Sequence, residues 1–476
     1  MTAELAPVPY QPQAQSPLSR PRLAAVLIPS LAFLMVTLDS LVVVTAMPQI
    51  HRTLGGSASG MAWIVNAYTL VFAAGIVTGA ALGDRFGRRR IFLTGLVIFT
   101  LASAACAMAP TLAVLIGVRA MQGFGAALLT PVGLALISAA FPPERRGAAV
   151  GIWGGIAGVG VAAGPLVGGT VTQDLNWHWV FWINLPIGVA VFAAALRVLQ
   201  ESRGPARRLD LPGMILVVIA IGLLVDALIN VPDAGRLSAR TIGLLAAAAA
   251  AVLILVVLER RASAPMLPPA LFRRRSFLAS NLANLLCSAA IFSAAYVTSL
   301  YFQLGLGHSP LGTGLRFLPW TAMPLIIAPL AGRWFDRVGA RRLAGSGLLL
   351  QAVGFCAIAV LAGAGAPWPA FIVAFVAAGA GVSLAIPTLP AAALASVDPD
   401  QVGIAAGVTN TMQRIGAVLG IAVITAVFGA HGSLTSPTAV ITGFRWAIGA
   451  AALISILGAV TTLAIRAADR PGRTRP

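Results

Sequence analysis

Three charged residues lie deep within long apolar stretches of this sequence: Asp39, Arg119 and Arg414. A charged side chain is costly in hydrocarbon, so each is a functional candidate by default. Asp39 lies about nine residues before the end of its stretch and Arg119 about seven after the start of its own, so the two reach similar depths if their helices run in opposite directions. A guanidinium favours the charged form of a nearby carboxylate, whereas burial disfavours it. We therefore expect Asp39 to bind and release a proton and Arg119 to tune it; the alternative is a permanent ion pair that fixes two helices.

The segments that must position these residues are expected to be membrane helices. Of the 476 residues, 58% are hydrophobic and only 10% are charged, against about 25% charged in a typical soluble domain. Apolar stretches of roughly 20 residues, each long enough to cross a bilayer, recur from Leu23 to near the end of the chain. They predict an all-α integral membrane protein of about fourteen helices. The predicted helices cover residues 23–47, 61–82, 91–109, 112–140, 148–171, 180–199, 211–230, 240–259, 277–302, 313–333, 342–363, 368–394, 403–429 and 441–465.

The arginines of the predicted loops indicate the orientation of the chain. Every one of the 32 basic residues is an arginine, and the net charge is +18. Alternate loops are rich in arginine, while the other set holds only Arg52, Arg236, Arg240, Arg316 and Arg445. By the positive-inside rule the rich loops are cytoplasmic, so both termini are predicted inside. The charge is therefore explained by topology without nucleic-acid binding, and the Arg-only, Ala-rich composition favours a bacterial cytoplasmic membrane.

An internal repeat divides the chain. Asp84-Arg85-Phe86-Gly87-Arg88 recurs as Asp336-Arg337-Val338-Gly339, and residues 143–151 are echoed by 399–407. Both copies fall in equivalent loops on the same side, as in the parallel halves of alternating-access transporters. The predicted parts are a disordered cytoplasmic tail (1–22), an N-terminal six-helix half (23–200), an inserted two-helix hairpin with its linkers (201–276), a C-terminal six-helix half (277–466) and a cytoplasmic tail (467–476).

The repeated loop combines a turn with opposite charges. Gly87 permits the positive φ of a sharp turn, and Asp84 can accept hydrogen bonds from Arg side chains or helix N-termini. We expect a conformational latch between the halves, and the alternative is an ordinary arginine-rich cytoplasmic loop. The residues assigned to the latch are Asp84, Arg85, Gly87, Arg88, Asp336, Arg337 and Gly339.

Two further patterns concern helix packing and the cavity. Gly160, Gly164 and Gly168 form a stripe of small residues, which by itself indicates close helix packing, and Pro165 beside it bends the helix. Polar residues lie along two helices of the second half, where they either line a cavity or join helices by hydrogen bonds. The candidates for the substrate cavity are Gln122, Asn281, Asn284, Tyr296, Asn410, Gln413 and Arg414.

Several motifs together resemble the major facilitator superfamily. The stretch 80–89 is similar to that family's signature between its second and third helices, and 115–123 to its fourth-helix motif. Residues 160–169, which include Gly160, Gly164, Pro165, Gly168 and Gly169, resemble its fifth-helix antiporter motif. Together with 38–48 and 177–186, they are similar to the fourteen-helix drug:proton antiporters; Ala80, His178 and Val44 depart from the usual pattern. The resemblance implies the major facilitator fold, a cavity lined by the first and fourth helices where Asp39 and Arg119 can meet, and a fifth-helix bend that limits proton leak and sets the antiport direction.

The expected function is proton-coupled antiport that exports hydrophobic or cationic small molecules by alternating access. The alternatives are a dedicated exporter of one endogenous metabolite or self-made antibiotic and, with less support, an uptake symporter. The sequence contains no phosphate-binding loop and no GxSxG or HExxH motif, so we expect no enzyme activity, cofactor or metal. The expected partners are a small-molecule substrate, protons and the lipid bilayer, with the chain as a monomer.

Overall fold

The computed structural model describes residues 20–204, 211–229, 238–261, 269–363, 365–398 and 401–465, and most of these residues are helical. The tails predicted for residues 1–22 and 467–476 fall almost entirely outside these ranges. Fourteen segments of the described chain are helices long and apolar enough to cross a bilayer. The prediction of an all-α membrane protein with fourteen spans is therefore confirmed.

The elements and their bounds are α1 (Arg20–Leu54), α2 (Ala58–Phe86), α3 (Arg88–Ala107), α4 (Leu112–Ala140), α5 (Pro143–Asp174), α6 (Trp179–Trp182), α7 (Asn184–Val198), α8 (Leu211–Ile229), α9 (Ala239–Arg261), α10 (Pro269–Phe272), α11 (Arg275–Leu300), the π-helix η2 (Tyr301–Gly305), α12 (Pro310–Thr321), α13 (Met323–Val338), α14 (Ala340–Gly363), α15 (Trp368–Leu394), α16 (Val402–His431) and α17 (Pro437–Thr462). Three spans consist of two pieces: α6 with α7, α11 with η2, and α12 with α13. Pro324 at the start of α13 explains the last break, because proline lacks the N–H that a continuous helix needs.

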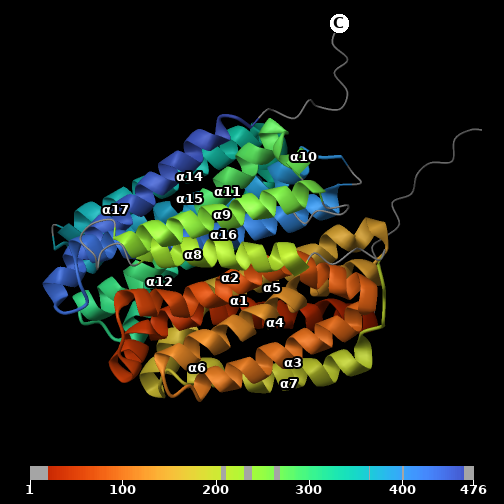
Figure 1. Ribbon diagram of the computed structural model, residues 1–476, viewed down its shortest axis with the longest axis horizontal. Coiled ribbons are helices and arrows are strands. Elements are labelled where there is room, and N and C mark those ends of the chain that lie inside the picture. Colours follow the sequence, from red (N-terminus) through yellow and green to blue (C-terminus); the bar gives the residue numbers. More distant parts are fainter. Residues whose placement is uncertain are drawn as a thin grey trace, which may run out of the picture.

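The helices form two bundles joined by a hairpin. In Figure 1 the N-terminal half, α1–α7, is drawn in red to yellow, and the C-terminal half, α11–α17, lies beside it in green to blue. The hairpin α8–α9 lies across the seam, where α8 packs against both α2 and α16 and α9 packs on α8. This is the arrangement of two six-helix halves with an inserted pair that the repeat predicts.

The turn predicted at Gly87 is confirmed. Gly87 separates α2 from α3 with φ +111°, and its counterpart Gly339 separates α13 from α14 with φ +84°. Both values lie in the region that favours glycine because a side chain would be strained there. The repeat therefore preserves a backbone conformation as well as a sequence.

The halves touch at the end of the bundle that carries few arginines, which we call the arginine-poor end. Gln303 donates a hydrogen bond to the carbonyl of Thr45 at 2.9 Å. Near the same end, the backbones of α5 and α12 are so close that a Cβ on Gly314 would lie 2.4 Å from the carbonyl oxygen of Pro165. In the first part of α5, toward the arginine-rich end, a Cβ on Gly151 or Gly154 would meet no described atom within 4 Å. Along α5, the halves therefore part toward the arginine-rich end.

Candidate functional site

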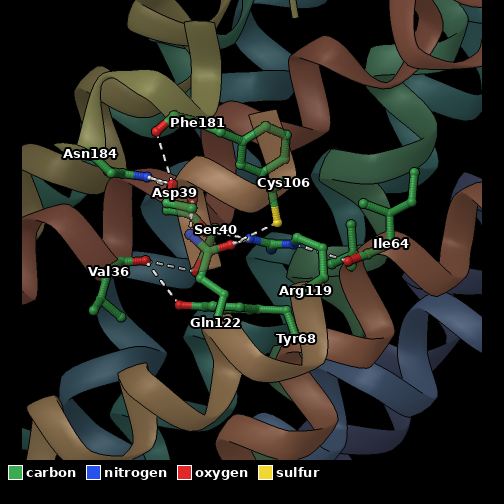
Figure 2. A network of polar contacts seen from close by, with 12 residues as sticks. Val36, Asp39, Ser40, Ile64, Tyr68, Cys106, Arg119, Gln122, Phe181 and Asn184 are labelled. Carbon is green, nitrogen blue, oxygen red and sulfur yellow. Dashed lines mark hydrogen bonds and ion pairs between the residues drawn. The ribbon is translucent and has the colours of Figure 1, made fainter. Parts of the chain in front are cut away.

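A buried polar network joins α1, α4 and α7 at the centre of the N-terminal half (Figure 2). Nη1 of Arg119 lies 2.6 Å from Oδ2 of Asp39, and both side chains are fully buried. Nε2 of Gln122 and Nδ2 of Asn184 donate to Oδ1 of Asp39 at 2.9 and 3.0 Å. The carboxylate thus accepts three side-chain hydrogen bonds, and its charge is matched by one guanidinium.

The guanidinium of Arg119 is held on its other sides as well. Its Nη1 also donates to Oε1 of Gln122 at 2.7 Å, and its Nε donates to the carbonyl of Ile64 at 3.2 Å. Its central carbon lies 4.1 Å from the centre of the Tyr68 ring, which is a cation–π distance. Nη2 has no partner among the described residues. Arg119 therefore keeps several contacts that do not depend on the charge of Asp39.

Close helix packing produces this geometry. A Cβ on Gly123 would lie 2.2 Å from the carbonyl oxygen of Tyr68, so α4 and α2 can approach this closely only because residue 123 is glycine. That approach places the Tyr68 ring against Arg119, four residues before Gly123 on α4. Gly123 thus helps to form the site, because it allows the close approach of helices that brings Tyr68 to Arg119.

The net charge of this network, which is closed to water, depends on Asp39. With Asp39 ionised, the pair with Arg119 is neutral overall, and with Asp39 protonated the same group of side chains carries one positive charge. In a medium of low dielectric constant, such a change alters interactions over several ångströms. The electrostatic field inside the N-terminal half is therefore sensitive to the charge of this one carboxyl group.

The sequence predicts that two members of this network, Asp39 and Arg119, meet. It assigns a third member to the substrate cavity instead. Gln122 is a predicted cavity residue, and the structure places it beside Asp39 and Arg119. Asn184 and Tyr68 were not predicted to join them. The available signal for Asn184 is an amide within an apolar span, inside the stretch 177–186 that resembles the antiporters.

The predicted latch contacts its own half in this structure. Nε and Nη2 of Arg88 donate to Oδ1 of Asp84 at 3.0 and 2.8 Å. The carboxylate of Glu201, which follows α7, accepts hydrogen bonds from the backbone N–H groups of Arg89 and Arg90 at 2.9 and 3.3 Å. Arg85 is exposed, with its guanidinium 5.3 Å from the ring of its neighbour Phe86. Asp84, Arg88 and the first N–H groups of α3 thus make their hydrogen bonds within the N-terminal half.

The second copy of the loop has fewer described contacts. Gly339 makes the turn given above, and Arg337 is exposed. The side chain of Asp336 lies outside the described part of the chain. The latch function of both copies stays a prediction.

Removal of the Glu201 carboxylate is expected to destabilise the start of α3. Glu201→Ala leaves two N–H groups at this helix end without their acceptor, so we expect a loss of about 1 kcal/mol in the free energy of unfolding. The apparent melting temperature of the purified protein in detergent measures this. Asp174→Ala, which removes an exposed carboxylate from the last residue of α5, is the control; an equal shift in both variants would contradict the capping role.

The glycine stripe of α5 packs against α1. A Cβ on Gly160, Gly164 or Gly168 would lie 2.9, 2.7 or 2.2 Å from side-chain atoms of Leu34, Leu41 or Thr45, respectively. The next glycine faces the other half, because a Cβ on Gly169 would lie 2.5 Å from the carbonyl oxygen of Pro310 at the start of α12. The predicted antiporter motif thus joins α5 to α1 on one side and to the C-terminal half on the other.

The polar candidates of the C-terminal half fall into two groups. Asn281 donates to the carbonyl of Phe277 in its own helix, and Asn284 donates to that of Thr409 on α16; both side chains are buried. Tyr296 is fully buried in a hydrophobic cluster that includes residues of both halves. The hydrogen bond of Asn284 thus joins two helices, α11 and α16.

Asn410, Gln413 and Arg414 form the second group. Asn410 is exposed and the other two are partly exposed, although all three lie well within the span of α16. The guanidinium carbon of Arg414 lies 4.3 Å from the centre of the Phe72 ring on α2. Arg414 therefore lies at the contact between the halves, and Asn410, one helical turn earlier, lies on the same side of α16.

Comparison with known proteins identifies the family. Residues 30–325 and 282–476 match the family model described as Major Facilitator Superfamily. The chain is 36% identical to a "Multidrug resistance protein Stp" of Mycobacterium tuberculosis over 88% of this chain and 78% of the other. It is 33% identical to the "Tetracenomycin C resistance and export protein" of Streptomyces glaucescens over 82% of this chain and 73% of the other. A crystal structure of a POT family transporter in complex with 5-aminolevulinic acid has the same fold, with a TM-score of 0.68, 15% identity and coverage of 94% of this chain and 96% of the other. The chain belongs to the major facilitator superfamily.

Proposed function

We propose that this protein is a proton-coupled antiporter that exports hydrophobic small molecules from the cell by alternating access. The superfamily membership and the relatives named for multidrug resistance and for resistance and export support a role in efflux. In this proposal the arginine-rich end and both termini face the cytoplasm, in accordance with the positive-inside rule. The protein acts as a monomer in the cytoplasmic membrane.

The observation that carries the proton coupling is the buried pair of Asp39 and Arg119. Asp39 is completely buried in the middle of α1 and is held by three side-chain hydrogen bonds. An ionisable group at this depth is retained in membrane proteins chiefly for function, and proton relays are one of its main uses. Asp39 would take up a proton in one conformation and release it in the other, while Arg119 stays attached through Gln122, Ile64 and Tyr68.

The same helix connects this pair to the contact between the halves. Ser299 and Gln303 of the C-terminal half donate hydrogen bonds to the carbonyls of Val44 and Thr45, which follow Asp39 by about one and a half helical turns. A change of charge at Asp39 that shifts α1 therefore acts on the hydrogen bonds that hold the arginine-poor end closed. In this proposal, protonation acts on opening through α1 and these hydrogen bonds.

A dedicated exporter of one metabolite or self-made antibiotic is the second candidate. It shares every step of this mechanism and differs only in the breadth of its substrates. The relatives include one named for multidrug resistance and one named for resistance to a single compound.

Transport by purified protein in liposomes tests the proposal. With an imposed pH gradient, we expect movement of a neutral apolar dye against its gradient, together with counter-movement of protons reported by a trapped pH indicator. Movement of dye and protons in the same direction would instead establish a symporter. Dye movement that does not respond to the pH gradient would contradict proton coupling.

A further inference from the structure

Arg414 differs from Arg119 in having no counter-charge. It lies on α16 at the contact with the N-terminal half, where Phe72 lies against its guanidinium and Thr411 donates to the carbonyl of Ala73 at 3.4 Å. No hydrogen bond or ion pair joins Arg414 to any residue in the described ranges. Its side chain remains partly exposed.

The helices that pack around Arg414 carry few acidic residues. The helices α11, α15 and α16 contain no aspartate or glutamate, and the only acid of α2 is Asp84, which lies in the last three residues of that helix and pairs with Arg88. The helix α8, which packs against both α2 and α16, carries Asp226, and Asp226 pairs with Arg240. Asp39 is already bound to Arg119. The contact between α2 and α16 therefore carries one uncompensated positive charge.

Two neutral donors accompany this charge. Asn410 precedes Arg414 by four residues, which places both on one side of the helix, and Gln413 is adjacent in sequence. Neither amide makes a hydrogen bond to a described residue. Polar groups at membrane depth must be satisfied by protein, by water in a cavity or by a ligand, so these three side chains require water or a ligand between the halves.

We propose that Arg414, with Asn410 and Gln413, binds the acidic group of the cargo, and that this cargo is an apolar ring compound bearing an ionised carboxylate, sulfonate or phenolate. This inference rests on the proposed export function and narrows its hydrophobic substrates to those that carry an ionised acidic group, in place of the cationic substrates that the sequence analysis also names. Hydrogen bonds between a guanidinium and an organic anion are charge-assisted and short. The ring of Phe72 offers an apolar surface beside that charge. A cationic cargo would meet an unshielded like charge at the same place.

The proton site and this anion site are built on different arginines. Arg119 lies 4.1 Å from the centre of the Tyr68 ring and Arg414 lies 4.3 Å from the centre of the Phe72 ring, and the two ring centres are 5.8 Å apart. A proton on Asp39 would leave Arg119 positive, which attracts an anion rather than expelling it. Exchange of anion for proton therefore depends on the change of conformation, without direct competition for one site.

A matched pair of dyes tests the charge preference. 1-Anilinonaphthalene-8-sulfonate and N-phenyl-1-naphthylamine share one ring system and differ in the sulfonate, and both fluoresce when bound in apolar surroundings. Binding is titrated in lipid nanodiscs with empty discs subtracted. Arg414→Gln is expected to weaken binding of the sulfonate about tenfold, the loss of one charge-assisted contact, and to leave the neutral dye within about twofold. Arg414→Lys, which keeps the charge, is expected to stay within about threefold of the unaltered protein for the sulfonate.

Arg316→Gln is the matched control, since Arg316 also stacks on an aromatic ring, that of Trp368 at 5.6 Å, but lies in α12 near the arginine-poor end. Equal losses for both dyes, no loss for the sulfonate in Arg414→Gln, or no binding of the sulfonate by the unaltered protein would each overturn the proposal. Tighter binding of ethidium than of the sulfonate would do the same. Export of either dye in liposomes is measured separately, so failure of proton-driven export with the binding pattern intact would refute the transport proposal alone.

Discussion

Asp39→Asn is expected to abolish proton-driven export while leaving the protein folded. Asparagine has nearly the same shape, and its oxygen can still accept hydrogen bonds from Arg119, Gln122 or Asn184. It cannot change its charge, so the group remains permanently in a state that resembles the protonated one. We expect the rate of dye export driven by a pH gradient to fall at least about 100-fold, as is usual when an essential proton-transfer group is removed.

Asp226→Asn is the matched control for this loss. Asp226 also lies in an apolar helix, but in the hairpin, where it pairs with Arg240 on the neighbouring helix at 3.3 Å. We expect this variant to retain export. A purely structural ion pair between Asp39 and Arg119 predicts a different result for Asp39→Asn, namely that the folded variant still exports dye when a pH gradient is imposed. Export that continues at the normal rate in Asp39→Asn would show that the coupling role is wrong.

Arg119→Met is expected to destabilise the protein strongly in a manner that depends on pH. The substitution leaves the Asp39 carboxylate in a sealed site without its counter-charge, and breaking a buried pair in this way typically costs about 3–5 kcal/mol. A proton on Asp39 removes the buried charge. The destabilisation should therefore shrink as pH falls and grow as pH rises, measured as the difference in melting temperature from the unaltered protein across a pH series.

The double variant Arg119→Met with Asp39→Asn provides the control. Removing both charges removes the cause of the destabilisation, so we expect most of the lost stability to return and the pH dependence to disappear. The sum of the two single effects would then exceed the effect of the double variant, which is the signature of a coupled pair. Equal instability of the single and double variants, or destabilisation independent of pH, would contradict this account.

Local features of the fold were accessible from the sequence because they depend on nearby residues. Spans follow from runs of apolar residues, since each run must be long enough to cross the hydrocarbon core. The positive φ at Gly87 follows from the turn between two helices and from the absence of a side chain. The boundaries are less exact: α1 extends to Leu54, past Pro48, beyond the predicted end at residue 47. The helix continues because tertiary packing holds Ile50 in the core.

The partners of the charged loop illustrate what local reasoning missed. The repeat of Asp84 and Arg88 favoured a latch between the halves, but Glu201, which comes after α7, accepts the N–H groups at the start of α3. Glu201 is separated from this loop by five helices of sequence, so no local pattern indicates the contact. The same applies to Asn184, which reaches Asp39 only because α7 packs against α1.

The sequence by itself determined that this chain is a membrane protein, how many times it crosses the bilayer and which ionisable residues lie at membrane depth. It could do so because hydrocarbon penalises every exposed charge, so each charged residue in an apolar stretch stands out. Only the tertiary structure decided that Asp39 and Arg119 form one sealed and neutral pair while Arg414 stands between the halves without a counter-charge. Depth along a helix is a property of the sequence. The direction in which a side chain points, and the charge that it meets there, depend on how the helices pack.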